Sequence, residues 1–93
     1  MGKEQSGSAS LRAFRRKMAN PVHWRRANQV VGKYTRQDVA TVESATRVID
    51  DLSTSFGIEL TPSDKRKAAQ WLVQQGIDPQ RRKDRLLLWK KTK

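Results

Sequence analysis

The sequence has no cysteine and only one histidine, so it is poor in the residue types that build metal and redox sites. The absence of cysteine excludes disulfides and thiolate zinc sites. The single histidine, His23, lies among arginines, and no carboxylate is near it in sequence to orient it as a general base. No glycine-rich phosphate loop or metal-ligand spacing is present. We therefore expect a protein that is not an enzyme and has no metal or cofactor.

Long apolar runs and strand patterns are also scarce. The longest apolar run covers residues 86–89, LLLW, whereas a bilayer-spanning helix needs roughly 20 residues. The first residues lack the apolar stretch of a signal peptide, so we expect a cytoplasmic protein that does not enter a membrane. No segment alternates apolar and polar residues as a β-strand does. The sequence therefore predicts an all-α fold.

The strongest helical pattern covers residues 35–56, and we predict one scaffold helix there. Its apolar residues are spaced by three and four, which lines one face of an α-helix. They are Val42, Ala45, Ile49, Leu52 and Phe56, with Val39 and Val48 beside them. Thr35 is the expected N-cap, and Asp38 is the expected capping-box acid. Gly57 followed by Ile58 is the expected C-terminal stop.

Two short helical patterns precede this segment and two follow it. The first pair covers residues 10–19 and 21–31, separated by Asn20–Pro21 as an N-cap and a first helical residue. In the second pair, Thr61–Pro62 begins one helix and Asp78–Pro79 begins the last. Gly32 and Gly76 are the glycines expected to end the second helix and the helix that begins at Thr61–Pro62.

These patterns predict a small helical bundle, in which a three-helix unit is preceded by one or two short basic helices. Residues 1–9 are expected to be a disordered lead and residues 10–33 a basic helical arm. Residues 34–93 are expected to form a three-helix domain with a basic C-terminal helix. A chain of 93 residues has room for one such domain. The apolar stripe could also serve as a coiled-coil seam, so a homodimer is an alternative.

Acidic residues are outnumbered by 20 Lys and Arg to 9 Asp and Glu, which gives a net charge of +11. Residues 1–34 carry +7, residues 35–60 carry −3, and residues 61–93 carry +7. Two basic blocks that flank an acidic segment attract polyanions, so nucleic acid is the first partner to expect. The charge does not distinguish DNA from RNA, and no helix-turn-helix pattern fits around the glycines.

The predicted nucleic-acid contacts come from these two basic blocks. Arginine and lysine side chains bind phosphate, and an exposed tryptophan can stack on an unpaired base. For Trp24, packing on the helical core is the alternative to stacking. The predicted nucleic-acid-binding residues are Arg12, Arg15, Arg16, Lys17, Trp24, Arg25, Arg26, Arg81, Arg82, Lys83, Arg85, Lys90 and Lys91.

We interpret the chain as a small regulatory or accessory protein that binds nucleic acid mainly through its phosphates. A second interpretation depends on Trp71, Leu87 and Trp89, which a phosphate binder does not need and which protein interfaces favour. In that case the chain is an adaptor or inhibitor that binds an acidic surface of a protein partner, such as a nucleic-acid enzyme. A ribonucleoprotein subunit is a third interpretation, intermediate between these two.

Overall fold

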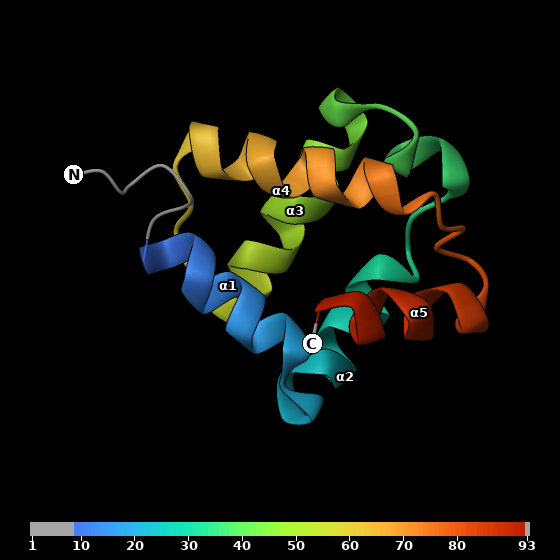
Figure 1. Cartoon of the computed structure of the whole chain (residues 1–93), viewed down its shortest axis with the longest axis horizontal. Coiled ribbons are helices and arrows are strands. Elements are labelled where there is room, and N and C mark those ends of the chain that lie inside the picture. The colour runs from blue at the N-terminus through green and yellow to red at the C-terminus, as the bar shows by residue number, and fades with distance from the viewer. Residues whose placement is uncertain (1–8, 93) are drawn as a thin grey trace.

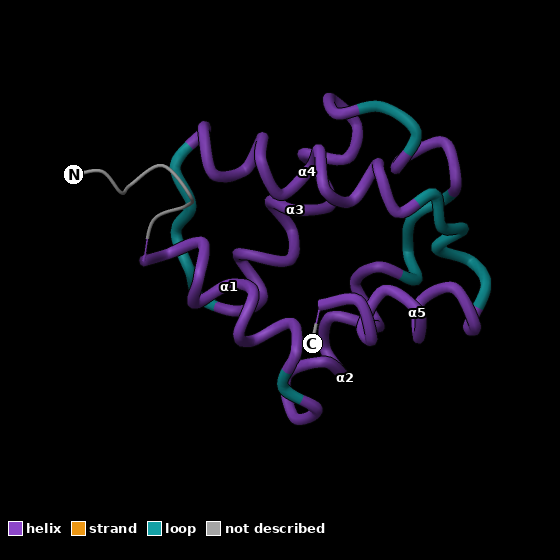
Figure 2. The backbone as a smooth tube through the Cα atoms, viewed as in Figure 1, coloured by secondary structure: helices purple, strands orange, loops and turns teal. Residues whose placement is uncertain are grey.

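The computed structural model describes residues 9–92, and every regular element in that range is a helix (Figures 1 and 2). The elements are α1 (Ala9–Ala19), α2 (Pro21–Val31), a short 3₁₀ helix η2 (Arg36–Val39), α3 (Val42–Phe56), α4 (Pro62–Gln75) and α5 (Arg82–Thr92). The predicted all-α bundle is confirmed. The predicted lead lies outside the described residues, except for Ala9. None of the described helices has both the length and the apolar character that crossing a bilayer requires.

Helix α3 is the scaffold, and it packs against α4, α2, α1 and η2. The main contacts of α5 are with α1 and α2. In Figure 1, α4 lies along the top of the molecule, and α1, α2 and α5 occupy its lower half. All five α-helices contribute to one core, with Leu11, Val31, Ile49, Leu72 and Leu88 among its buried residues. The helices predicted as a basic arm are therefore part of the same core as the rest of the chain.

The central segment consists of two helices, and the prediction of one helix over residues 35–56 is wrong. Thr41 has an extended backbone, and its hydroxyl accepts a hydrogen bond from the Ser44 N–H at 3.2 Å. It is therefore a second N-cap, and it starts α3. The predicted cap belongs to η2, where the Asp38 carboxylate accepts from the Thr35 N–H at 2.7 Å and from its hydroxyl at 3.0 Å. These two hydrogen bonds hold the pKa of Asp38 below its usual value, and the one from the backbone N–H has the larger effect.

The predicted apolar stripe forms the centre of the core. Ala45, Val48, Ile49 and Leu52 are at most 2% exposed. They lie on α3, which packs between α2 and α4 of the same chain. A coiled-coil seam would require this face to be free, so this stripe is not the contact surface of a homodimer.

The helix ends at Gly57 and Gly76 are confirmed. Gly57 is left-handed with φ 70°, and the Ile58 N–H donates to the Ser53 carbonyl at 2.9 Å, which is a Schellman stop. Gly76 is also left-handed, with φ 60°. Gly32 caps α2 as predicted, but its φ of −65° is right-handed.

The last helix begins at Arg82, three residues later than predicted. Asp78 closes a turn, because its carboxylate accepts a hydrogen bond from the Gln80 N–H at 3.0 Å. The Asp78 N–H donates to the Asp84 carboxylate at 2.8 Å, which ties this turn to the first turn of α5. Aspartate favours both helix caps and such turns, and here the turn holds Pro79 in the interior.

Candidate nucleic-acid interface

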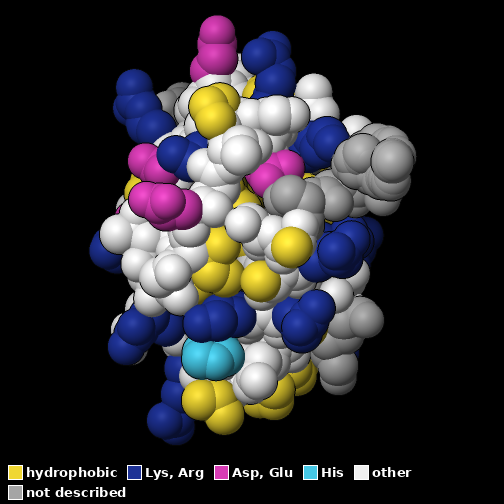
Figure 3. All heavy atoms as spheres, turned by 90° about the vertical axis from the view of Figure 1, so that its left-hand side faces the viewer, with side chains coloured by type: hydrophobic (Ala, Val, Ile, Leu, Met, Phe, Trp, Pro, Cys, Tyr) yellow, Lys and Arg dark blue, Asp and Glu magenta, His cyan; other side chains and the backbone are white. Residues whose placement is uncertain are grey.

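The two basic blocks of the sequence meet because α5 packs on α1 and α2. We call residues 9–33 and 81–92, which contain these three helices, the basic layer. It holds thirteen Lys and Arg residues and one acid, Asp84, whereas residues 34–80 hold five Lys and Arg and seven acids. In Figure 3, acidic side chains are confined to the upper half of the face, where Lys and Arg lie among them, and the charged side chains of the lower half are Lys and Arg. The two predicted basic flanks thus form one layer.

Nine of the predicted binding residues are exposed and make no side-chain hydrogen bond or ion pair with another described residue. They are Arg12, Arg15, Arg16, Arg25, Arg81, Arg82, Lys83, Lys90 and Lys91. Lys33 is a further exposed cation in the layer, and the predicted set did not include it. Its position within the first basic block was the signal that could have identified it. These side chains are all open to solvent.

Lys17 and Arg26 instead bind the C-terminal end of α3. The Lys17 ammonium donates to the Phe56 carbonyl at 3.1 Å, and Arg26 Nη1 donates to the Ser55 carbonyl at 3.1 Å. The last carbonyls of a helix lack partners within the helix, and the dipole favours positive charge there. Both side chains therefore attach α1 and α2 to α3, and the predicted phosphate contacts must come mainly from other residues.

Arg85 is engaged within the fold in the same way. Its Nε donates to the Asn28 amide oxygen at 2.6 Å, and its Nη1 donates to the Pro79 carbonyl at 2.7 Å. These bonds attach α5 to α2 and to the turn that precedes α5. Beside them, the Gln80 amide donates to the Gly32 carbonyl at 2.9 Å. The Arg85 guanidinium is thus used to join elements that are distant in the sequence.

Trp24 packs within the protein, which was the alternative to base stacking. Its ring stacks on that of Trp89, with centroids 6.3 Å apart and planes inclined by 25°. The Trp89 indole N–H donates to the Ala19 carbonyl at 3.0 Å, so this tryptophan also joins helices. No aromatic side chain among residues 9–92 is fully exposed. The basic layer therefore presents cations without an aromatic platform for bases.

The remaining residues of chemical interest have ordinary packing or surface positions. His23 lies edge-on to Phe56, with ring centroids 6.3 Å apart. Residues 9–92 contain no group of His, Asp and Glu placed to hold a metal ion. Of the side chains predicted for a protein partner, Trp71 lines a pocket and Leu87 is 48% exposed on α5.

Comparisons of the chain with protein-family models, with curated proteins and with solved structures found no match. The functional proposal therefore depends on the charge and geometry of the chain itself.

Proposed function

We propose that the protein binds nucleic acid through phosphate contacts from the basic layer. The observation that supports this most directly is the set of nine exposed cations without intramolecular partners. Eight of them are carried by three helices that pack on one another, and the ninth, Arg81, directly precedes α5. Cations arranged in this way displace the counterions of a nucleic acid, and they recognise its backbone with little regard to sequence. The role we propose is regulatory or accessory, without catalysis, and in the cytoplasm.

We further propose that duplexes bind more tightly than single strands of the same length. Proteins that bind single strands gain about 1–3 kcal/mol per base from stacking on aromatic side chains. Trp24 and Trp89 stack on each other, so the basic layer offers no free platform of that kind. A duplex needs only phosphate contacts, and it carries about one charge per 1.7 Å of its axis. Phosphate contacts alone do not select DNA over RNA.

The test is an electrophoretic shift of the nuclease-treated protein with duplex DNA, hairpin RNA and single-stranded DNA at two salt concentrations. If about six of the nine cations meet phosphates, affinity should fall roughly a thousandfold between 50 and 200 mM salt. An affinity that does not change with salt would contradict phosphate-led binding. Tighter binding of the single strand would contradict the proposed preference for duplexes.

A further inference from the structure

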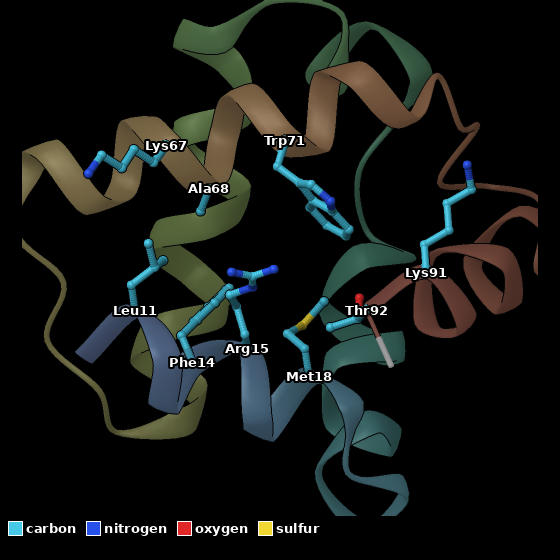
Figure 4. A pocket seen from close by; sticks show the side chains of 9 residues that line it. All are labelled: Leu11, Phe14, Arg15, Met18, Lys67, Ala68, Trp71, Lys91 and Thr92. Carbon is cyan, nitrogen blue, oxygen red and sulfur yellow. The ribbon is translucent and has the colours of Figure 1, made fainter. Parts of the chain in front are cut away.

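A pocket of about 260 Å³ lies between α1, α4 and α5 (Figure 4). Its apolar lining consists of Leu11, Phe14 and Met18 from α1 and of Ala68 and Trp71 from α4. Figure 4 shows the Trp71 ring reaching from α4 toward α1 and α5. The pocket therefore presents part of the Trp71 ring, which is partly buried, between three helices.

The charged residues that line this pocket, in the part of the chain that the structure describes, are all basic: Arg15, Lys67 and Lys91. Arg15 and Lys91 are exposed and have no side-chain partner among the described residues. In Figure 4, the Arg15 guanidinium points from α1 toward α4, and Lys91 lies on the side of α5. No acid among residues 9–92 lines the pocket. A complementary ligand therefore carries an apolar group together with negative charge.

On α5, an exposed apolar residue lies one helical turn before Lys91, which lines the pocket. Leu87 precedes Lys91 by four residues, which places both in one row of the helix, and Lys83 precedes Leu87 by the same interval. Leu87 is 48% exposed, and both lysines are exposed. The row therefore presents an apolar side chain between two cations, and successive members of the row are about one helical turn, or 5.4 Å, apart.

The chemistry of the pocket favours a protein side chain over a nucleobase. Its volume of about 260 Å³ is just below the roughly 300–1,000 Å³ of pockets for small ligands, so it has room for one bulky group. A base would also bury polar edges, which is costly without hydrogen-bond partners. Apart from the Trp71 indole, Thr92 is the one uncharged polar side chain that the described residues contribute to the lining. Its hydroxyl already donates to the Leu88 carbonyl at 2.8 Å.

We propose that this pocket and Leu87 bind an acidic, amphipathic peptide segment of a partner protein. A bulky apolar side chain of the peptide enters the pocket against Trp71, and a second one, a helical turn away, covers Leu87. Carboxylates of the peptide pair with Arg15 and Lys91. This is recognition of a helix in a groove, with an aromatic anchor. The inference does not depend on the proposed nucleic-acid binding, although the two ligands would compete for Arg15 and Lys91.

The probe is a synthetic Glu/Ala peptide of about 15 residues, near the length at which isolated helices become stable, with Phe and Leu four residues apart. Its binding to the isotope-labelled full chain is followed through the three tryptophan indole N–H signals, assigned with Trp71→Phe. We expect the Trp71 signal to shift and that of Trp89 to stay, because its N–H is held by the Ala19 carbonyl. Replacing the peptide's Phe by Ala should weaken binding about tenfold.

Three charge-neutral variants locate the site. Leu87→Ser removes the apolar contact beside Lys91, and Ala68→Leu fills the pocket, so each should weaken peptide binding about tenfold. Leu86→Ser is the matched control, because Leu86 is 45% exposed on the next row of the same helix. All three variants should leave duplex binding unchanged, so failure of this inference is distinguishable from failure of the proposed nucleic-acid binding.

Several results would overturn the inference. If replacing the peptide's Phe by Ala does not weaken binding and the Trp71 signal does not shift, the binding is charge attraction alone. Equal effects of Leu86→Ser and Leu87→Ser would also contradict the site. The pocket would belong to a different occupant if the Trp71 signal shifted with single-stranded DNA, anionic vesicles or a higher protein concentration but did not shift with the peptide. Absence of peptide binding would overturn it outright.

Discussion

Basic side chains of the same type divide into those that hold the fold together and those that face solvent. Lys17, Arg26 and Arg85 donate to carbonyl or amide oxygens of other elements, while Arg12 and Arg82 are exposed without such partners. The sequence does not separate the two groups, because residue type and helical spacing are alike in both. The partner of Arg85, Asn28, is 57 residues away in the chain. The division depends on tertiary contacts.

We predict that Arg85→Gln lowers the free energy of unfolding by about 1–3 kcal/mol, because two partly buried oxygen acceptors lose their donor. Arg82→Gln is the matched control on the same helix. Its side chain is exposed, so we expect a change within about 0.5 kcal/mol. Urea denaturation of both variants measures the difference. Equal losses in the two variants would show that the Arg85 contacts do not stabilise the fold.

The phenol of Tyr34 is coupled to the acidic side of α3. Its hydroxyl donates to the Asp51 carboxylate at 2.8 Å. The pKa of Tyr34 is raised from 10.0 to about 12. Burial is the largest cause, followed by this hydrogen bond and by the charges of the neighbouring carboxylates. The folded protein thus holds the phenol proton more tightly than the unfolded chain does. Its contribution to stability is complete below pH 10 and is lost as the pH rises toward 12.

Because Tyr34 is the only tyrosine, its titration can be followed directly by phenolate absorbance. We predict a midpoint near pH 12 for the folded protein and near pH 10 in denaturant. In Tyr34→Phe, the free energy of unfolding should fall less between pH 10 and pH 12 than in the wild type, because the phenol is absent. A midpoint near 10 in the folded protein would contradict the coupling to Asp51.

Among the elements, helix ends were predictable where one local signal stands alone. Gly57 and Gly76 stop their helices as expected, because few residues other than glycine adopt the left-handed conformation easily. The starts of α3 and α5 were not predictable in the same way. Thr35 and Thr41 are both good N-caps within the predicted helix, and Asp78 can begin a helix or close a turn. Packing decides between such local alternatives, and sequence pattern does not show packing.

We predict that Gly57→Ala costs about 1 kcal/mol of folding free energy. The position has φ 70°, and an added Cβ would meet no atom of a non-neighbouring residue within 4 Å, so the cost comes from the left-handed backbone and not from a clash with the rest of the fold. Gly57→Asn should cost less, since asparagine tolerates the left-handed conformation. Thermal or urea unfolding measures both. An Ala variant as stable as the wild type, or one more stable than the Asn variant, would contradict this explanation of the stop.

For the whole molecule, the all-α bundle was predictable and the joining of the basic blocks was not. The helices follow from local periodicity, but α5 could return to any face of the scaffold. It packs on α1 and α2, and this contact brings the two blocks into one layer. The same contact engages Trp24, Trp89 and Arg85 inside the protein. It also completes the pocket between α1, α4 and α5, which no single segment indicates.

We propose that position in the basic layer, and not net charge alone, directs the binding of nucleic acid. Two triple variants test it, and each removes three positive charges. Arg12→Gln, Arg16→Gln and Arg25→Gln change exposed cations of the layer. Arg36→Gln, Arg47→Gln and Arg66→Gln change exposed cations elsewhere in the chain. Neither set includes a residue that lines the pocket between α1, α4 and α5.

The most direct measurement is the salt dependence of duplex binding for these two variants and the wild type. For the layer variant we predict weaker binding and a slope of log K against log salt that is shallower by roughly 2–3, since up to three phosphate contacts are lost. The control variant should keep the wild-type slope. Equal losses in the two variants, or a larger loss in the control, would contradict the claim.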